Sequence, residues 1–412
     1  MTAYKPKVRF ARKLLCVFLV FGILSAAFSF SAAAGGENEK GTNYPFVFVA
    51  GYAGWGQYDR LNNALPYWGR LNGDLIKYLN EQGFECGAAS VDPLGSAWDR
   101  ACELYAQMTG TVVDYGGVHA ARYNHKRFGT DYSKKPLLTG WGEPDGSGGI
   151  NKVNLVGHSF GGATIRLLAQ LLADGSPEEF AGTSGAVSGR GVSPLFTGGK
   201  ADWIHSITTY AAPHNGADSV LVFSPVELIT AFDAFKGLEP LKTRPVFKDI
   251  YSIGKSLSLL RVKDWGLCDL YVDGAFELNK NLSANENIYY FSFPSDATVE
   301  SPRSAKRIPD TSVADPLFYT NIYMIGRGTA VTDKGIVIDE RWFNNDGVVN
   351  TVSTIAPFNE PQRVFDPADI SPGIWHIMPT YRGDHAAVIG GLSYAVDINA
   401  MYLEQLRLIN SL

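Results

Sequence analysis

The chain has 412 residues, of which 45% are hydrophobic and 19% are charged. This composition is typical of a soluble globular protein, and the length suits one large domain or two ordinary ones. The formal net charge of -5 argues against the basic surface that a nucleic-acid-binding protein needs.

The first 34 residues have the layout of a secretory signal peptide. Basic residues from Lys5 to Lys13 precede an apolar run from Leu14 to Phe30, and Ala32-Ala33-Ala34 offers a small-residue cleavage site. A membrane anchor is the alternative, but the run is barely long enough to span a bilayer and ends in Ser and Ala. We therefore expect residues 1–34 to be removed and the protein to be secreted.

Strand and helix patterns then alternate along the chain. Strands are expected at 43–51, 85–90, 151–157, 203–213 and 287–293, and helices at 72–84, 99–108 and 163–173. This alternation predicts an α/β fold with a mostly parallel sheet covered by helices on both faces. No Pro- or Ser-rich linker divides residues 35–412, so we expect one domain with two long insertions, at about 94–149 and 215–267.

Cysteines give this domain no disulfide framework. Cys86, Cys102 and Cys268 would remain after cleavage, an odd number in a long chain. A pair between Cys86 and Cys102 stays open. A chain of this size can be held together by its core instead.

The stretch "NLVGHSFGGA" places Ser159 between a predicted strand and a predicted helix. A strand–G-x-S-x-G–helix junction is typical of a nucleophile elbow, in which a strained turn exposes the serine hydroxyl. A glycine-rich turn with an incidental serine is the alternative. The context on both sides favours the elbow.

A serine nucleophile also needs a base and an acid, which in this arrangement follow it in the order acid, then histidine. His385 lies in a polar loop near the C-terminus, whereas His376 lies between apolar residues, where a packed histidine is expected. The residues alone leave Asp339, Glu340 and Asp346 open as the acid, with Asp346 well placed in an Asn-Asp-Gly turn. The oxyanion hole is expected from the backbone N–H groups of Tyr52 and Phe160.

Seven blocks of the sequence carry a resemblance to a known family. They are "GYAGWG", "YWGRLNGDLIKYLNEQGFE", "DPLGSAWDRACELYAQMTGTVVDYGGVHAARYNHKRFG", "NLVGHSFGGATIRLLAQLL", "SPLFTGGKADWIHSITTYAAPHNG", "IDERWFNNDGVVNTVS" and "GIWHIMPTYRGDH". In this order they resemble the secreted zinc-containing bacterial lipases of the Geobacillus and Staphylococcus type. The resemblance covers nearly all of residues 35–412 and implies an α/β-hydrolase fold.

The resemblance implies roles for individual residues. It makes Ser159 the nucleophile, Asp346 the acid and His385 the base, with Tyr52 and Phe160 as oxyanion donors. Because the family commonly has Gln after the nucleophile, Phe160 is expected to make the mouth of the site more apolar.

The resemblance also implies a structural Zn²⁺ site in the first insertion. Its motif corresponds to Asp99, His119 and His125, although two histidines in a polar loop are by themselves more often plain surface residues. Because His119 and His125 are six apart, a bend must lie between them. Lys263 occupies the register of the fourth ligand, so a one-residue shift to Asp264 is needed.

Two further features of the family bear on this chain. A calcium site beyond the catalytic histidine needs carboxylates where this chain has Ala387 and Leu392, so we expect that site to be absent. The segment from Asn215 to about Phe247 corresponds to the family's lid, although its apolar pattern would equally suit a core helix.

The function implied is that of a secreted lipase that hydrolyses acylglycerol esters through an acyl-enzyme at a lipid surface. A short-chain esterase and a polyester hydrolase share this chemistry, and a non-catalytic surface-binding protein is a different alternative. A zinc protease is disfavoured because H-E-x-x-H is lacking, and "GEPDGSGG" lacks the Lys-Ser/Thr of a phosphate loop.

Overall fold

The computed structural model describes residues 44–183, 191–218, 264–391 and 397–412. The expected signal peptide and most of the expected lid lie outside these ranges, as does Leu392. Within them, no helix is both long enough and apolar enough to cross a membrane. Cys86 and Cys102 form no disulfide.

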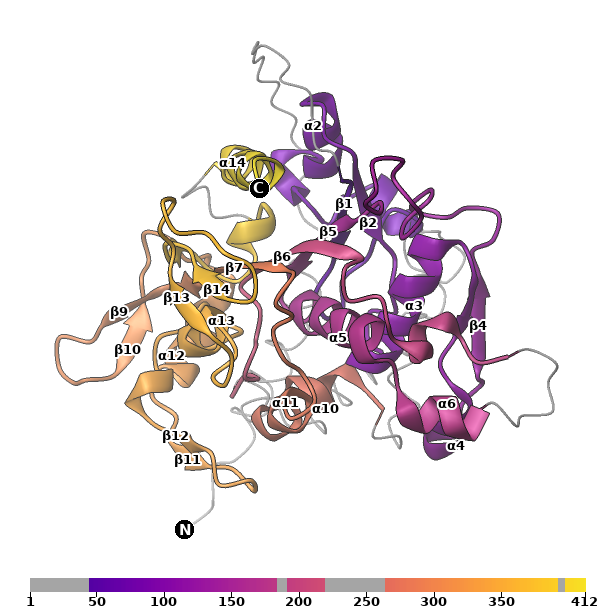
Figure 1. Cartoon of the computed structure of the whole chain (residues 1–412). Coiled ribbons are helices and arrows are strands. Elements are labelled where there is room, and N and C mark those ends of the chain that lie inside the picture. The colour runs from indigo at the N-terminus through magenta and orange to yellow at the C-terminus, as the bar shows by residue number, and fades with distance from the viewer. Residues whose placement is uncertain (1–43, 184–190, 219–263, 392–396) are drawn as a thin grey trace, which may run out of the picture.

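A seven-stranded sheet forms the centre of the molecule (Figure 1). Its order is β13-β14-β7-β6-β5-β1-β2, and every neighbouring pair is parallel. The strands are β1 (Phe46–Val49), β2 (Cys86–Ala89), β5 (Val153–His158), β6 (Ile204–Tyr210), β7 (Tyr289–Phe293), β13 (Gln362–Val364) and β14 (Trp375–Ile377). The parallel sheet confirms the expected α/β class.

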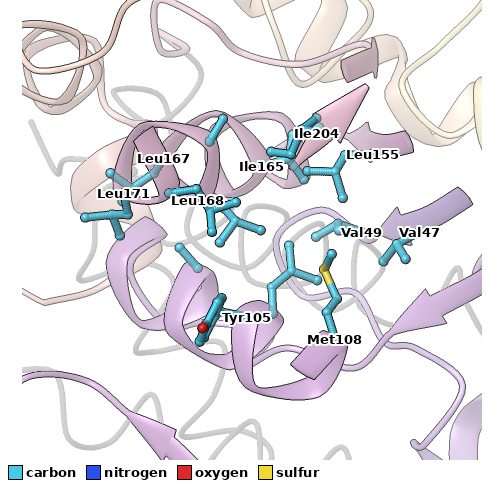
Figure 2. Packing of buried hydrophobic residues seen from close by; sticks show 14 of the residues in the cluster. Val47, Val49, Tyr105, Met108, Leu155, Ile165, Leu167, Leu168, Leu171 and Ile204 are labelled. Atoms are coloured by element: carbon cyan, nitrogen blue, oxygen red, sulfur yellow. The ribbon is translucent and has the colours of Figure 1, made fainter. Parts of the chain in front are cut away.

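Helices cover both faces of the sheet because alternate residues of a strand point to opposite sides. In β1, Val47 and Val49 pack with α3 (Ala97–Thr109) and α5 (Gly161–Asp174), as Figure 2 shows. Phe46 and Phe48 face the other way and pack in the cluster that contains α2 (Leu75–Glu81) and α14 (Ile398–Asn410). The central strands are therefore buried on both sides.

Two groups of elements are added to this core. The first lies beside α3 and comprises β3 (Val112–Asp114), α4 (Gly117–Tyr123), β4 (Phe128–Asp131) and α6 (Pro177–Thr183). The second follows β7 and comprises β8 (Ser295–Asp296), β9 (Thr298–Glu300), β10 (Arg307–Pro309), α12 (Tyr319–Ile325), β11 (Ala330–Val331), β12 (Val337–Ile338) and α13 (Thr351–Ile355). Helices α10 (Gly266–Leu270) and α11 (Val272–Asn279) precede β7, and β15 (Tyr381–Arg382) pairs with β8.

All the expected strands and helices are found, and N-capping side chains explain where two of the helices begin. The helix expected at 72–84 begins only at Leu75, because the Asp74 carboxylate accepts the N–H of Lys77 at 3.1 Å as an N-cap. The helix expected from Asp99 begins earlier, because Ser96 caps it by accepting the N–H of Asp99 at 3.2 Å.

Candidate active site and metal centre

Ser159 lies in the turn between β5 and α5 with φ at +54°, a conformation that is strained for a residue with a side chain. Its N–H donates to the carbonyl of Tyr210 at 3.0 Å, and its own carbonyl accepts the N–H of Gly162 at 2.9 Å. The turn has no room for larger neighbours, since a Cβ at Gly161 would lie 2.1 Å from the carbonyl oxygen of Val49. The backbone thus forms the sharp turn that the G-x-S-x-G pattern predicts.

Asp346 and His385 meet at 2.8 Å, between carboxylate Oδ2 and ring Nδ1. Asp346 is fully buried, and its Oδ1 accepts the N–H groups of Val348 and Val349 at 3.0 and 2.7 Å. Its Oδ2 also accepts the hydroxyl of Ser295 at 2.6 Å. A carboxylate held in this way accepts the Nδ1 proton of His385 and leaves Nε2 able to accept another.

The other candidates for acid and base do not join this pair. Asp339 forms an ion pair with Arg341 at 2.7 Å, and Glu340 is exposed. His376 is fully buried in β14, where its Nε2 lies 2.9 Å from the carbonyl oxygen of Ser371. The structure therefore resolves the alternatives in favour of Asp346 and His385 as the hydrogen-bonded pair.

His158, the residue that precedes Ser159, connects the elbow to the Asp346–His385 pair. The ring centroid of His158 is 4.7 Å from that of His385, and its Nε2 donates to the carbonyl of His385 at 3.1 Å. The carboxyl end of β5, which leads into Ser159, and the loop after β15, which carries His385, are thereby joined.

The loop after β1 contacts Ser159 from the other side. A Cβ at Gly51 would lie 2.6 Å from Cβ of Ser159 and 3.1 Å from its Oγ. The buried guanidinium of Arg100 donates to the carbonyls of Ala50 and Gly51, the latter at 3.2 Å, and to the hydroxyl of Thr164 at 3.0 Å. This loop carries the N–H of Tyr52 past the nucleophile.

The N–H groups of Tyr52 and Phe160 are both available. Neither donates a hydrogen bond to any of the residues that the structure describes. Because Arg100 binds the carbonyl of Gly51, the trans peptide directs the N–H of Tyr52 away from that guanidinium. Two free N–H groups on the turns beside a serine hydroxyl are the donors that an oxyanion hole requires.

The expectation that Phe160 makes the mouth of the site more apolar is wrong. Its side chain is only 1% exposed. The ring lies 6.5 Å from that of Tyr52, and the guanidinium of Arg100 lies 5.0 Å from its centroid. The ring packs beneath the loop because α5 begins here and directs the side chain towards α3.

Asp99, His119, His125 and Asp264 form a second cluster, with one donor atom from each within 4.8 Å of all the others. Asp99 comes from α3, and His119 from α4. Asn124, at φ +57°, ends α4 and provides the expected bend before His125. Asp264 lies just before α10, so the one-residue shift from Lys263 brings a carboxylate into the cluster.

The donors of this cluster fit a metal ion better than they fit one another. Nε2 of His119 lies 3.1 Å from Asp99 and 2.9 Å from Asp264, although one ring nitrogen carries at most one proton. Nε2 of His125 is buried without a hydrogen bond, 3.4 Å from Asp264. Donors about 2 Å from one tetrahedral zinc ion lie roughly 3.3 Å apart, and two imidazoles with two carboxylates are suitable zinc ligands.

The charges of the cluster point the same way. Burial disfavours a charge on His119, but the carboxylates of Asp264 and Asp99 outweigh it and raise the pKa of His119 to about 9. A divalent cation would replace that proton and balance both carboxylates.

Three buried residues of the site were not expected from the sequence. Tyr67 accepts the N–H of Gly51 at 2.9 Å and bonds to Nδ1 of His158 at 2.7 Å, while Arg100 holds the carbonyls of the same loop. The only local signal was His158 itself, which lies inside the elbow motif. Arg100 lies in a predicted helix and Tyr67 lies outside the predicted elements, and no pattern distinguishes either residue.

Comparison with known proteins shows similarity along most of the chain. The family described as "Lipase-like, C-terminal domain" matches residues 42–235 and 239–406. Lipase 2 of Staphylococcus aureus is 35% identical over 369 residues, which are 84% of this chain and 50% of that protein. A lipase of Staphylococcus epidermidis is 34% identical over 375 residues, 86% of this chain and 51% of that protein. The chain thus spans about half the length of the curated relatives it matches.

Two solved structures are similar throughout. EstA from Clostridium botulinum superposes with a TM-score of 0.76 at 32% identity, covering 91% of this chain and 89% of its own. Staphylococcus hyicus lipase superposes with a TM-score of 0.74 at 30% identity, covering 92% and 99%.

Proposed function

We propose, for a chain that belongs to the lipase-like C-terminal domain family and has the α/β-hydrolase fold, that it is a lipase that hydrolyses the carboxylic esters of acylglycerols. The single observation that carries this proposal is the buried Asp346–His385 pair, hydrogen-bonded through His158 to the strained Ser159 turn. The matched relatives are themselves named lipases.

In the proposed reaction, Ser159 Oγ attacks the ester carbonyl carbon while Nε2 of His385 takes the hydroxyl proton. The N–H groups of Tyr52 and Phe160 donate to the oxyanion that forms. His385 then gives its proton to the leaving alcohol, and an acyl-enzyme on Ser159 remains. Water, deprotonated by His385, attacks the acyl group, the bond to Oγ breaks, and the proton returns to the serine.

Asp346 has two tasks in this scheme. Its bond to Nδ1 keeps His385 in the tautomer whose Nε2 faces the nucleophile, and its charge stabilises the imidazolium that forms transiently. The N–H donors of Val348 and Val349 and the Ser295 hydroxyl hold the carboxylate in place.

Asp99, His119, His125 and Asp264 are proposed to hold a structural Zn²⁺. When bound, the ion would supply positive charge that cross-links α3, α4 and the start of α10. None of the four residues belongs to the proposed triad, so the ester chemistry is assigned wholly to the chain's own residues.

The protein is further proposed to act outside the cell, on lipid or ester substrates at an interface, with no nucleic-acid partner. Because the ring of Phe160 is buried, it gives no support to a polyester hydrolase. A non-catalytic binding protein would not need the strained serine and the buried acid–histidine pair.

Replacement of the nucleophile tests the proposal. Ser159→Ala is expected to lower kcat at least about 10⁴-fold on both emulsified long-chain triglycerides and dissolved p-nitrophenyl esters. Ser133→Ala, at an exposed serine, is the control and should match the parent. Equal hydrolysis by parent and Ser159→Ala would overturn the assignment, and faster turnover of emulsions than of dissolved esters would support a lipase over an esterase.

A further inference from the structure

A line of buried hydrogen bonds connects the loop after β1 to the loop of His385. The N–H of Gly51 donates to Oη of Tyr67 at 2.9 Å, Oη lies 2.7 Å from Nδ1 of His158, and Nε2 of His158 lies 3.1 Å from the carbonyl oxygen of His385. Tyr67, His158 and His385 are all buried.

The donor and the acceptor of each hydrogen bond in this line follow from the first bond, in which the N–H of Gly51 can only donate. Because Oη of Tyr67 accepts from Gly51, its own proton is donated to Nδ1 of His158. Nδ1 is then an acceptor, so the single ring proton of His158 is on Nε2 and is donated to the carbonyl of His385. Burial, reinforced by the charge of His385, lowers the pKa of His158 well below its ordinary value, which keeps the ring neutral in this tautomer.

The same bonds fix the loop that passes Ser159. Tyr67 accepts the N–H of Gly51 and Arg100 donates to its carbonyl, so both backbone polar groups of Gly51 are fixed. The crowding is close, since a Cβ at Gly51 would lie 3.0 Å from Oη of Tyr67 and 2.6 Å from Cβ of Ser159. The N–H of Tyr52 belongs to the same peptide unit as the carbonyl of Gly51, so its direction depends on this anchoring.

We propose that Tyr67 and His158 are positioning residues that hold the oxyanion loop and the His385 loop in a fixed relation around Ser159. The inference rests on the proposed ester hydrolysis. Neither residue contacts the substrate in this role; each acts through backbone groups of Gly51 and His385. A small displacement of either loop would separate the donor N–H from the oxyanion, which affects the transition state more than the bound substrate.

The ring of Tyr67 packs independently of its hydroxyl, which makes a clean test possible. It contacts Trp55 edge-on at 5.3 Å and lies under the guanidinium of Arg70 at 5.4 Å. Tyr67→Phe keeps these contacts and removes only the link between Gly51 and His158.

Tyr290→Phe is the matched control. Tyr290 is also buried, and its hydroxyl accepts the N–H of Asn285 at 2.9 Å, the same bond that Tyr67 makes to Gly51. It lies near the start of β7, whereas Ser159 follows the carboxyl end of β5 in the same parallel sheet. Both variants lose a buried tyrosine hydroxyl that accepts a backbone N–H, but only Tyr67→Phe loses it beside the proposed active site and together with a bond to His158.

The full chain of each variant is compared by kcat, KM, melting temperature and the rate of inactivation by a p-nitrophenyl alkylphosphonate, which forms a tetrahedral adduct on the nucleophile. Tyr67→Phe is expected to lower kcat and the inactivation rate about 10-fold, with KM within about 2-fold. Tyr290→Phe should lower the melting temperature about as much as Tyr67→Phe does, and it should leave kcat and the inactivation rate unchanged.

His158→Phe, which removes both ring nitrogens, is used if Tyr67→Phe does not fold, and should lower kcat at least as much. Parental kcat in a folded Tyr67→Phe or His158→Phe, alongside an inactive Ser159→Ala, would overturn this inference and leave the proposed hydrolysis intact. Activity in Ser159→Ala would remove both.

Discussion

The two polar clusters of this molecule differ in how far they are satisfied by the protein itself. Around Asp346 each carboxylate oxygen has donors, and His385 has its acid partner at 2.8 Å. In the second cluster His119 faces two carboxylates with one nitrogen, and Nε2 of His125 has no hydrogen bond. The first arrangement is complete without a ligand, whereas the donor atoms of the second are not all satisfied by one another.

The difference reflects two proposed functions: the first cluster is arranged to carry out a reaction, and the second is arranged to bind a cation. A triad works when its dipoles are already aimed before the substrate arrives, so its members must be paired in the resting protein. Metal donors must instead converge with their lone pairs directed at one point, which leaves them poorly paired with one another. The two clusters should therefore respond differently to the loss of one member.

The largest fall in kcat is expected from a change at Asp346, because this acid fixes the position of the proton on His385. Asp346→Asn keeps the shape of the side chain but favours the wrong tautomer of His385, so kcat should fall about 10⁴-fold with little change in KM. Steady-state hydrolysis of a p-nitrophenyl ester measures it. Asp339→Asn is the control, since Asp339 forms an ion pair with Arg341 and has no part in the proposed triad. A loss below about 10-fold would show that Asp346 does not orient the base.

Removal of the proposed zinc should lower the stability of the fold and leave the ester chemistry at Ser159 unchanged. Binding at about 100 times the Kd stabilises the folded chain by about 2.7 kcal/mol, so a chelator should lower the melting temperature of the parent. Asp264→Asn should melt at the lower temperature with or without chelator and contain less metal by elemental analysis. Asp202→Asn, at an exposed acid, should behave like the parent. Equal metal content in Asp264→Asn would exclude this carboxylate as a ligand.

A smaller effect is expected from crowding the oxyanion loop. Gly51→Ala places a methyl group 2.6 Å from Cβ of Ser159, so the loop must shift and kcat should fall about 100-fold. Gly191→Ala adds a methyl group with no atom within 4 Å and serves as the control. If Gly51→Ala loses stability and keeps its rate, the loop is not part of the oxyanion hole.

Much of the fold and of the predicted site follows from short patterns. The elbow is local in sequence, so the strand, the turn and the helix around Ser159 could all be predicted together. Asp346 and His385 needed their order along the chain and the family resemblance, because spacing alone also permitted Asp339 and Glu340. The structure distinguishes them through buried donors that no sequence pattern encodes.

What could not be predicted depends on contacts between distant segments. The side chain of Phe160 was expected at the mouth of the site, but the direction of a side chain at the start of α5 depends on how α5 packs against α3. Tyr67 and His158 are 91 positions apart in the sequence, so no local pattern predicts that they form a hydrogen bond. The shift from Lys263 to Asp264 likewise becomes clear only where the chain enters α10.

An ion bound by the proposed metal cluster would also tie together segments that lie far apart in the sequence. His125 and Asp264 are separated by 139 positions (264 minus 125), and one ion bound by both would close a loop of that length. Loop closure removes conformations from the unfolded ensemble, the effect usually ascribed to a disulfide, and the cost of closure rises slowly with loop length. Cys86 and Cys102 form no such bond here. For as long as the ion stays bound to both segments, such a cross-link would restrict the chain as a disulfide does, and a chelator could remove it.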